Sequence, residues 1–372
     1  MQQLGLLQDK SPAIRDTIAP TLSAKEMAQR VPDPDLFDGL SEREADQWAS
    51  YLYSKPKPQT KRLSSRSHVI SLYDPFASRK DFPAGRRWCV NVYTGCAFAC
   101  KYCYTVAYVK DAFHPRVKKG FERLLVKDLQ ELRGRALYPA PIHISNSTDP
   151  LQPLEATHRH TLFLLRQIQE NREHFTTITM LTKNPTRLCA PEYMEAIKAL
   201  TSFQVEVTCL VFRDESRRAL EPGAPTVESR LKGIRLLREQ GIAVSLRIDP
   251  IFPRDPLPRE IFSRPSLADY GILQGQTAED IENLIEFAAQ VGCQRIIVSP
   301  LKLVLGRFGR SRLLQTYLEL YSDANGGKPI RKGLSYRLPW ELYHRWIQGP
   351  TELAGKLGIE LVYCKRNLLT TT

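Results

Sequence analysis

The sequence YTGCAFACKYCY, at residues 93–104, follows a strand-like run and places three cysteines in the spacing C-x3-C-x2-C. Three thiolates from one short loop can hold three irons of a [4Fe–4S] cluster, for which four ligands are the usual complement. The fourth iron then stays open to a ligand that is not protein. Cys96, Cys100 and Cys103 are therefore predicted metal ligands at the centre of a catalytic site.

Two other interpretations fit part of this pattern. Cysteines at i, i+4 and i+7 share one helix face, where free cysteine can serve as a small buried hydrophobe. Gly95 and the β-branched residues before it instead favour a loop that leaves a strand. A zinc site would need a second Cys/His pair at ligand spacing, and the sequence shows none.

Length and composition describe an ordinary globular chain. The 372 residues are enough for one large α/β barrel with additional segments. No apolar run approaches the roughly 18 residues that span a bilayer, and the first residues lack a secretory signal pattern. Eight cysteines in this length, three of them clustered, favour a reducing compartment over a disulfide scaffold. We therefore expect a cytoplasmic protein without a membrane segment.

The net charge of +13 fits a polyanionic partner such as DNA or RNA. Residues 54–66 combine proline, serine and cations in a predicted mobile linker, which either contacts phosphates or is a solvated tether. Residues 306–312 and 328–337 interleave cations with Phe308 and Tyr336. Cations that alternate with rings suit phosphate contact and base stacking, although a solvated surface with core aromatics is the alternative.

Strand-like and helix-like segments alternate from Trp88 onward. The expected strands are residues 88–93, 141–146, 176–182, 203–212, 242–251 and 295–299. Between them, apolar residues recur at helical spacing, at residues 124–132, 162–168, 231–237 and 281–288. Six βα units in a row predict a parallel sheet with helices outside. Periodicity leaves open whether that sheet is flat or curled into a barrel.

Two further segments carry local predictions. The proline-rich stretch 253–276 interrupts the alternation, and a loop this long in a compact domain is usually functional. A lid or a substrate contact is therefore expected there. Residues 41–48 predict a short helix with Ser41 as its cap.

The cysteine spacing, with Tyr102 directly before the third cysteine, resembles the hallmark of the radical S-adenosylmethionine (SAM) superfamily. That resemblance implies an α/β fold, a partial (β/α)6 barrel of the TIM type in which the cluster loop follows the first strand. It also implies two cofactors, a [4Fe–4S] cluster and SAM. Tyr102 is expected to shield the cluster or to lie near the bound adenine.

Polar side chains at the strand ends are the expected SAM contacts, because chemistry gathers at the carboxyl ends of such barrels. They are Ser145, Asn146, Ser147, Thr148 and Asp149 after the second strand, Lys183 after the third, Thr208 in the fourth, Arg247 in the fifth and Ser299 in the sixth. Lys183 is the expected partner of the SAM carboxylate. Ser145, Ser147 and Thr148 stand where the superfamily binds the amino group, although its common Gly-Gly-Glu sequence is missing.

Several shorter motifs occur in the order typical of the spore photoproduct lyase-like family, which this chain resembles over about residues 86–305. They are N-x-Y-x-G-C at residues 91–96, STDPLQP at 147–153, LTKN at 181–184, LEPGAP at 220–225 with Arg230, and the run 247–250. This coverage divides the chain into an N-terminal extension with a basic linker (1–85), the radical SAM partial barrel (86–305) and a basic C-terminal extension (306–372).

The resemblance implies reductive cleavage of SAM and hydrogen abstraction from an unactivated C–H bond, with the cofactor carrying the hard step. The leading hypothesis is a lyase or modifying enzyme that acts on a nucleic acid or a nucleotide-like substrate and receives electrons from a flavodoxin- or ferredoxin-type donor. Modification of a peptide or a small metabolite is the alternative. A nucleic-acid-binding module with a structural cluster is the third hypothesis, since fold-level likeness does not fix function.

One position departs from the spore photoproduct lyases. In that family the segment after the second strand carries a cysteine that gives a hydrogen atom to the product radical, and this chain has Asn146 there. An amide N–H bond is much stronger than a thiol S–H bond. Cys209 is expected to face the helices, because it alternates with Thr208. The protein is therefore not expected to repair the thymine photoproduct.

Overall fold

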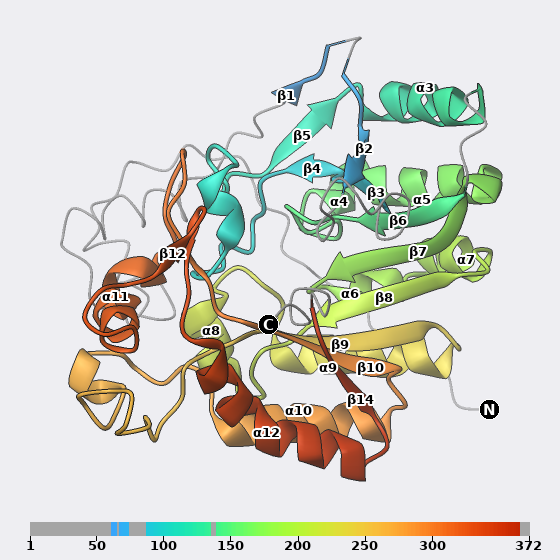
Figure 1. The fold of residues 1–372 in the computed structure, drawn as a ribbon. Helices are drawn as coiled ribbons and strands as arrows, with labels where there is room; N and C mark the ends of the chain where they lie inside the picture. Colours follow the sequence, from blue (N-terminus) through green and yellow to red (C-terminus); the bar gives the residue numbers. More distant parts are fainter. Residues whose placement is uncertain (1–60, 65–66, 74–86, 135–138, 365–372) are drawn as a thin grey trace, which may run out of the picture. The chain divides into compact units, whose positions relative to one another are not determined.

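The structure, a computed structural model, describes residues 61–64, 67–73, 87–134 and 139–364 (Figure 1). An eight-stranded sheet organises them, in the order β14-β10-β9-β8-β7-β6-β3-β2. Its strands are β2 (Ile70–Tyr73), β3 (Arg87–Val90), β6 (Ala140–Ile144), β7 (Phe175–Thr182), β8 (Phe203–Thr208), β9 (Ala243–Ile251), β10 (Arg295–Pro300) and β14 (Glu360–Tyr363). All neighbouring strands are parallel except β2 and β3.

This sheet confirms the predicted α/β architecture with six successive parallel strands, β3 and β6 to β10. Among the described residues the two edge strands, β2 and β14, do not pair with each other, so the barrel is partial. The expected first and fourth strands are shorter than predicted, since β3 ends at Val90 and β8 ends at Thr208. The antiparallel edge strand β2 and the last edge strand β14 were not predicted.

Helices follow the parallel strands along the chain. They are α3 (Phe121–Gly134), α4 (Glu155–His158), α5 (His160–Glu170), α6 (Pro185–Leu188), α7 (Pro191–Lys198), α8 (Asp214–Leu220), α9 (Val227–Glu239), α10 (Ala278–Gln290), α11 (Leu313–Asp323) and α12 (Trp340–Lys356). Local sequence explains their starts: Thr277 and Asp280 form a capping box at α10, and Thr226 caps α9. No described helix has both the length and the apolar character needed to cross a bilayer.

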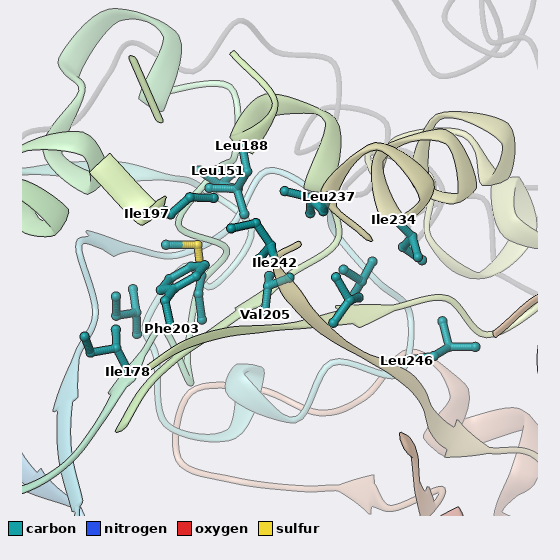
Figure 2. Close-up of a cluster of buried hydrophobic side chains, with 14 of the residues drawn as sticks. Leu151, Ile178, Leu188, Ile197, Phe203, Val205, Ile234, Leu237, Ile242 and Leu246 are labelled. Atoms are coloured by element: carbon teal, nitrogen blue, oxygen red, sulfur yellow. The ribbon is translucent and has the colours of Figure 1, made fainter. Parts of the chain in front are cut away.

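Two buried apolar clusters hold these layers together. The first packs the sheet against its helices, with Val205 and Leu246 from the strands facing Ile234 and Leu237 of α9 (Figure 2). The second contains Phe98, Cys100 and Tyr102 together with residues of α11 and α12. The predicted cluster loop is therefore part of a packed core rather than an exposed tip.

Smaller elements surround the cluster loop. A three-stranded sheet joins β1 (Lys61–Arg62), β5 (Arg116–Lys119) and β4 (Tyr93–Thr94), and another joins β11 (Leu303–Val304), β13 (Ser335–Tyr336) and β12 (Arg331–Lys332). Most of the predicted linker 54–66 and the helix expected at residues 41–48 lie outside the described residues. The C-terminal segment, assigned to an extension, supplies β14 to the main sheet.

The stretch 253–276 is irregular apart from the short 3-10 turn Ala268–Tyr270, as predicted. Several of its contacts are with α11 and α12: Arg264 pairs with Glu319 and Tyr270 donates a hydrogen bond to Asp323 of α11, and Glu260 pairs with Arg345 of α12. None of its described residues lines the pocket that holds the three predicted cysteines. These contacts show that the stretch packs on the core, and the lid or substrate contact expected from its length stays a prediction.

Candidate active site

The three predicted cysteines line one pocket, which has a volume of about 730 Å³. Cys96 follows β4, after Gly95 turns the chain with a φ of +76°. A Cβ atom at Gly95 would lie 2.6 Å from the carbonyl oxygen of His114, so the turn requires glycine. The amide of Cys96 donates to the carbonyl of Ala112 at 2.8 Å, which fixes the start of the loop.

The segment 220–225 fastens the cluster loop from its other side. The amide of Lys101 donates to the carbonyl of Leu220 at 2.9 Å, and the amide of Gly223 donates to the carbonyl of Phe98 at 3.1 Å. A Cβ atom at Gly223 would lie 2.2 Å from the carbonyl oxygen of Ala97. The LEPGAP motif is thus explained physically, since it brings backbone against backbone beside the cysteines.

A buried carboxylate stands next to this contact. Glu221 is fully buried, accepts a hydrogen bond from the Tyr102 hydroxyl and pairs with Nη1 of Arg230 at 2.5 Å. Burial alone would raise the pKa of Glu221, but Arg230 and then Lys183, 3.7 Å away, hold this pKa below its usual value. Tyr102 is therefore tied to an ionised group, which fixes the loop between the second and third cysteines.

The donor set fits a multinuclear cluster better than a single ion. Ligands of one tetrahedral zinc ion lie about 4 Å apart, because each Zn–S bond is about 2.3 Å. Among the described residues, the three cysteine sulfurs do not form a group in which all ligand atoms lie within 4.8 Å of one another. In an iron–sulfur cluster each thiolate binds a different iron, so wider spacing is expected.

The thiols also need a compensating positive charge. Burial raises the pKa of the Cys100 thiol to about 12, and it raises the pKa of Cys96 well above its usual value. A bound metal deprotonates a coordinating thiol, which burial alone opposes. The loop is therefore suited to hold thiolates only when a metal group occupies it.

The structure brings nearly all of the predicted SAM contacts to the same pocket. Its lining includes Tyr102, Asn146, Ser147, Thr148, Asp149, Lys183, Thr208, Arg247 and Ser299. Ser145 does not line it: its hydroxyl is fully buried without a hydrogen-bond partner, and its φ is +70°. These placements agree with a shared site, and the individual SAM contacts stay predictions.

Asp149 and Arg247 are among the lining residues that other groups of the chain already engage. Asp149 accepts hydrogen bonds from the hydroxyl of Thr182 and the amide of Lys183, which positions the end of β7. Arg247 pairs with Glu206 at 2.6 Å and with Asp249. Asp149 and Arg247 thus act at least in part as positioning groups, a role that strand-end position alone did not predict.

Other residues in and around the pocket were not predicted from the sequence. Asn91 lies outside the lining of the pocket. Its Oδ1 atom accepts hydrogen bonds from the backbone amides of Asn146 and Ser147 at 2.9 and 2.8 Å, which orders the segment after β6. The lining also includes Arg87, His143, Arg295, Lys302, Arg337 and Cys364. The N-x-Y motif could have identified Asn91 as part of the site. No local sequence pattern predicted strand β14 or placed Cys364, which follows it, in the pocket.

The cysteines outside the loop differ in position. Cys209 is fully buried in the core and does not line the pocket, as its alternation with Thr208 predicted. Cys364 follows β14 and lines the pocket, where it accepts a hydrogen bond from Nη2 of Arg247 at 3.0 Å. Cys364, rather than Cys209, is therefore the additional thiol of the site.

The fold and the loop define a class: a parallel α/β barrel whose three-cysteine loop, at the carboxyl ends of its strands, suits an iron–sulfur group. Residues 90–255 match the family model of the radical SAM superfamily, so this segment is a radical SAM domain. Proteins of that superfamily use a [4Fe–4S] cluster and SAM, and the match supports an enzymatic role. The identification drawn from the cysteine spacing is confirmed.

This chain matches only part of the length of its curated relatives. An uncharacterised protein of Methanocaldococcus jannaschii is 28% identical over 169 residues, which are 45% of this chain and 62% of that protein. The radical SAM Nalpha-GlyT isomerase of Pseudomonas phage M6 is 23% identical over 285 residues, which are 72% of this chain and 51% of that protein. This chain thus covers less than two thirds of either relative.

Solved structures support the partial barrel. A spore photoproduct lyase in complex with a dinucleoside spore photoproduct is 12% identical with a TM-score of 0.52, covering 85% of this chain and 84% of that chain. The Y98F mutant of a spore photoproduct lyase is 11% identical with a TM-score of 0.51, covering 88% and 96%. At these identities the likeness concerns the fold.

Proposed function

We propose that this radical SAM enzyme acts on a nucleic acid or a nucleotide-like substrate. The observation that carries the proposal is the charge of the pocket beside the cluster loop. Six basic residues line it: Arg87, Lys183, Arg247, Arg295, Lys302 and Arg337. Three carboxylates oppose them: Asp149, Glu206 and Asp249. A pocket with this excess of cations favours an anionic substrate such as one that carries phosphate.

Within this proposal the chain binds and orients its ligands. When bound, the cluster supplies the electron that cleaves SAM to a hydrogen-abstracting radical. Lys183 provides a half-buried ammonium for the SAM carboxylate, while Ser147 and Thr148 provide polar groups for its amine. Thr208 faces the same space from β8 and is suited to contact the ribose. The packed rings of Tyr102 and Phe252, with centroids 5.8 Å apart, exclude water beside the cysteines.

The test is 5′-deoxyadenosine formation by the anaerobically reconstituted protein with SAM and a reductant. Pools of DNA, RNA and peptide are added in separate reactions. We expect DNA or RNA to accelerate the release of 5′-deoxyadenosine. Acceleration by the peptide pool alone would overturn the proposal in favour of peptide modification. No cleavage of SAM by a protein that holds its full cluster would favour a structural role for the iron.

Nucleic acid affinity should fall steeply with salt, because binding to phosphates releases counterions. Replacing Arg307, Arg310 and Arg312 with glutamine should make the plot of log K against log salt less steep. The slope should decrease by about 0.9 for each phosphate contact that is lost. Fluorescence anisotropy at several salt concentrations measures this slope. The matched control replaces three exposed cations of the outer helices, Arg166, Lys198 and Lys232, and should leave the slope unchanged. Equal slopes in both triple variants would contradict the assignment of residues 306–312 to phosphate binding.

Repair of the thymine photoproduct is not expected. Asn146 lines the pocket, and its side-chain amide donates to the sulfur of Cys89 at 3.1 Å. Because its N–H bond is much stronger than an S–H bond, Asn146 cannot replace a thiol as hydrogen-atom donor. The assay incubates reduced enzyme and SAM with photoproduct-containing DNA and measures thymine recovery.

Clean multiple-turnover return of two thymines would show this expectation to be wrong. The cysteine variants would then identify the donor. Loss of repair in Cys364→Ala would point to the thiol that lines the pocket, and loss in Cys209→Ala would point to the thiol that is buried in the core.

A further inference from the structure

Three large aromatic rings are exposed beside the pocket. Tyr104, Tyr108 and Phe308, which we call the aromatic rim, have exposed fractions of 46%, 44% and 46%. The two tyrosines line the pocket, and their ring centroids lie 6.1 Å apart. Tyr104 is oriented by a hydrogen bond from its hydroxyl to the carbonyl of Asn146. Grouped exposed rings of this kind mark contact sites for other molecules.

The rim is built from two segments that are far apart in sequence. Tyr104 begins the 3-10 helix η2 (Tyr104–Ala107), and Phe308 lies in the loop after β11. That loop packs closely on η2, because a Cβ atom at Gly306 would lie 2.2 Å from the carbonyl oxygen of Ala107. The amide of Arg312 donates to the carbonyl of Lys101 at 3.1 Å. These contacts hold Phe308 next to the cluster loop. In Figure 1, η2, drawn in cyan, lies beside the hairpin that β12 forms with β13.

Cations lie beside Phe308 of the rim and beside the neighbouring ring of Tyr336. The guanidinium of Arg307 lies 5.2 Å from the centroid of the Phe308 ring, and that of Arg331 lies 6.0 Å from the Tyr336 ring. Residues 302–337 contain eight basic residues and two acidic ones. The basic residues are Lys302, Arg307, Arg310, Arg312, Lys328, Arg331, Lys332 and Arg337. The rim therefore offers flat apolar faces inside a strongly positive surface.

We infer that the aromatic rim is a stacking platform for unpaired bases of a single-stranded nucleic acid, whose backbone follows the cations of residues 302–337. This inference rests on the proposed function and specifies its substrate as single-stranded or locally unpaired. Base faces are accessible to aromatic side chains only where the strand is unpaired, whereas phosphates are accessible in a duplex as well. Rings and cations together thus distinguish a single strand from a duplex.

The experiment measures dissociation constants of the reconstituted full chain by fluorescence anisotropy at one fixed salt concentration. The probes are a labelled single strand of about 12 nucleotides, within the range that such surfaces cover, and the duplex of the same sequence. We expect the single strand to bind more tightly than the duplex. Tyr108→Ala and Phe308→Ala should each weaken single-strand binding roughly 5- to 150-fold, as expected when one base is no longer stacked.

Matched variants separate stacking from other causes. Phe308→Tyr keeps a ring and should retain affinity, whereas Phe308→Leu keeps apolar character without a ring face and should lose affinity as Phe308→Ala does. Phe212→Ala removes an exposed ring, 37% exposed, that does not line the pocket, and should leave affinity unchanged. Thermal unfolding of each variant confirms that it is folded.

Two outcomes would overturn the inference in distinguishable ways. Duplex binding as tight as single-strand binding, with unchanged affinity in Phe308→Ala, would remove the stacking platform and leave the proposed function standing. No binding of either probe at low salt, with no acceleration of SAM cleavage, would remove both.

Discussion

Replacing Cys100 with alanine is expected to remove most of the bound iron and all cleavage of SAM. The reason is geometric, because the three loop cysteines are the predicted protein ligands and the middle one, Cys100, is buried in the core around the loop. A site with two thiolates has no third protein ligand to hold a cluster whose fourth iron is open. Iron content and visible absorbance after anaerobic reconstitution measure the cluster, and 5′-deoxyadenosine measures the activity. Cys96→Ala and Cys103→Ala should behave alike.

Five other cysteines provide the controls: Cys89, Cys189, Cys209, Cys293 and Cys364. Each should be dispensable for iron binding when replaced singly, and Cys293, on the loop after α10, is the best matched because it is buried away from the pocket. A full cluster in Cys100→Ala would contradict the ligand assignment. Loss of iron in Cys89→Ala or Cys364→Ala would mean that a fourth protein ligand closes the site.

The local pattern of apolar residues predicted the strands and helices, because that pattern depends on neighbouring residues in the sequence. The β-branched runs and the helical spacing between them identified six parallel strands and the helices that follow them, because burial on a sheet or along a helix face produces those periods. The spacing of Cys96, Cys100 and Cys103 identified the loop for the same reason, since one loop must present all three sulfurs. The polar groups after these strands then met in one pocket, as parallel strands require.

The features of the fold and the site that were not predicted depend on contacts between segments that are distant in sequence. Strand β14 is only four residues long and pairs with β10, more than sixty positions earlier, so no local period distinguishes it from a surface segment. Cys364 therefore could not be placed beside Arg247 from sequence. The pairing of Arg247 with Glu206 was likewise invisible, because it depends on the alignment of neighbouring strands. The boundaries of the three proposed domains stay predictions.

The partners of Glu221 illustrate the same limit, and they carry a large expected effect on stability. Arg230 is completely buried, and besides its ion pair with Glu221 it donates hydrogen bonds to the carbonyls of Thr208 and Pro225, both at 3.0 Å. Replacing Arg230 with methionine leaves the carboxylate of Glu221 buried without its nearest cation. Breaking one side of a buried ion pair typically destabilises a protein by about 3–5 kcal/mol. We expect a loss of that size in the free energy of unfolding.

Urea unfolding of the variant and the parent chain measures this loss, and two further variants make the result specific. Arg218→Met removes an exposed pair with Glu215, 3.6 Å apart on α8, and should change stability by less than about 1 kcal/mol. Adding Glu221→Gln to Arg230→Met removes the buried charge that has lost its nearest cation and keeps an acceptor for the Tyr102 hydroxyl, so it should restore part of the loss. Equal stability of Arg230→Met and Arg218→Met would contradict a buried ion pair. Failure of Glu221→Gln to restore any stability would instead assign the effect to the hydrogen bonds that Arg230 donates to the two carbonyls.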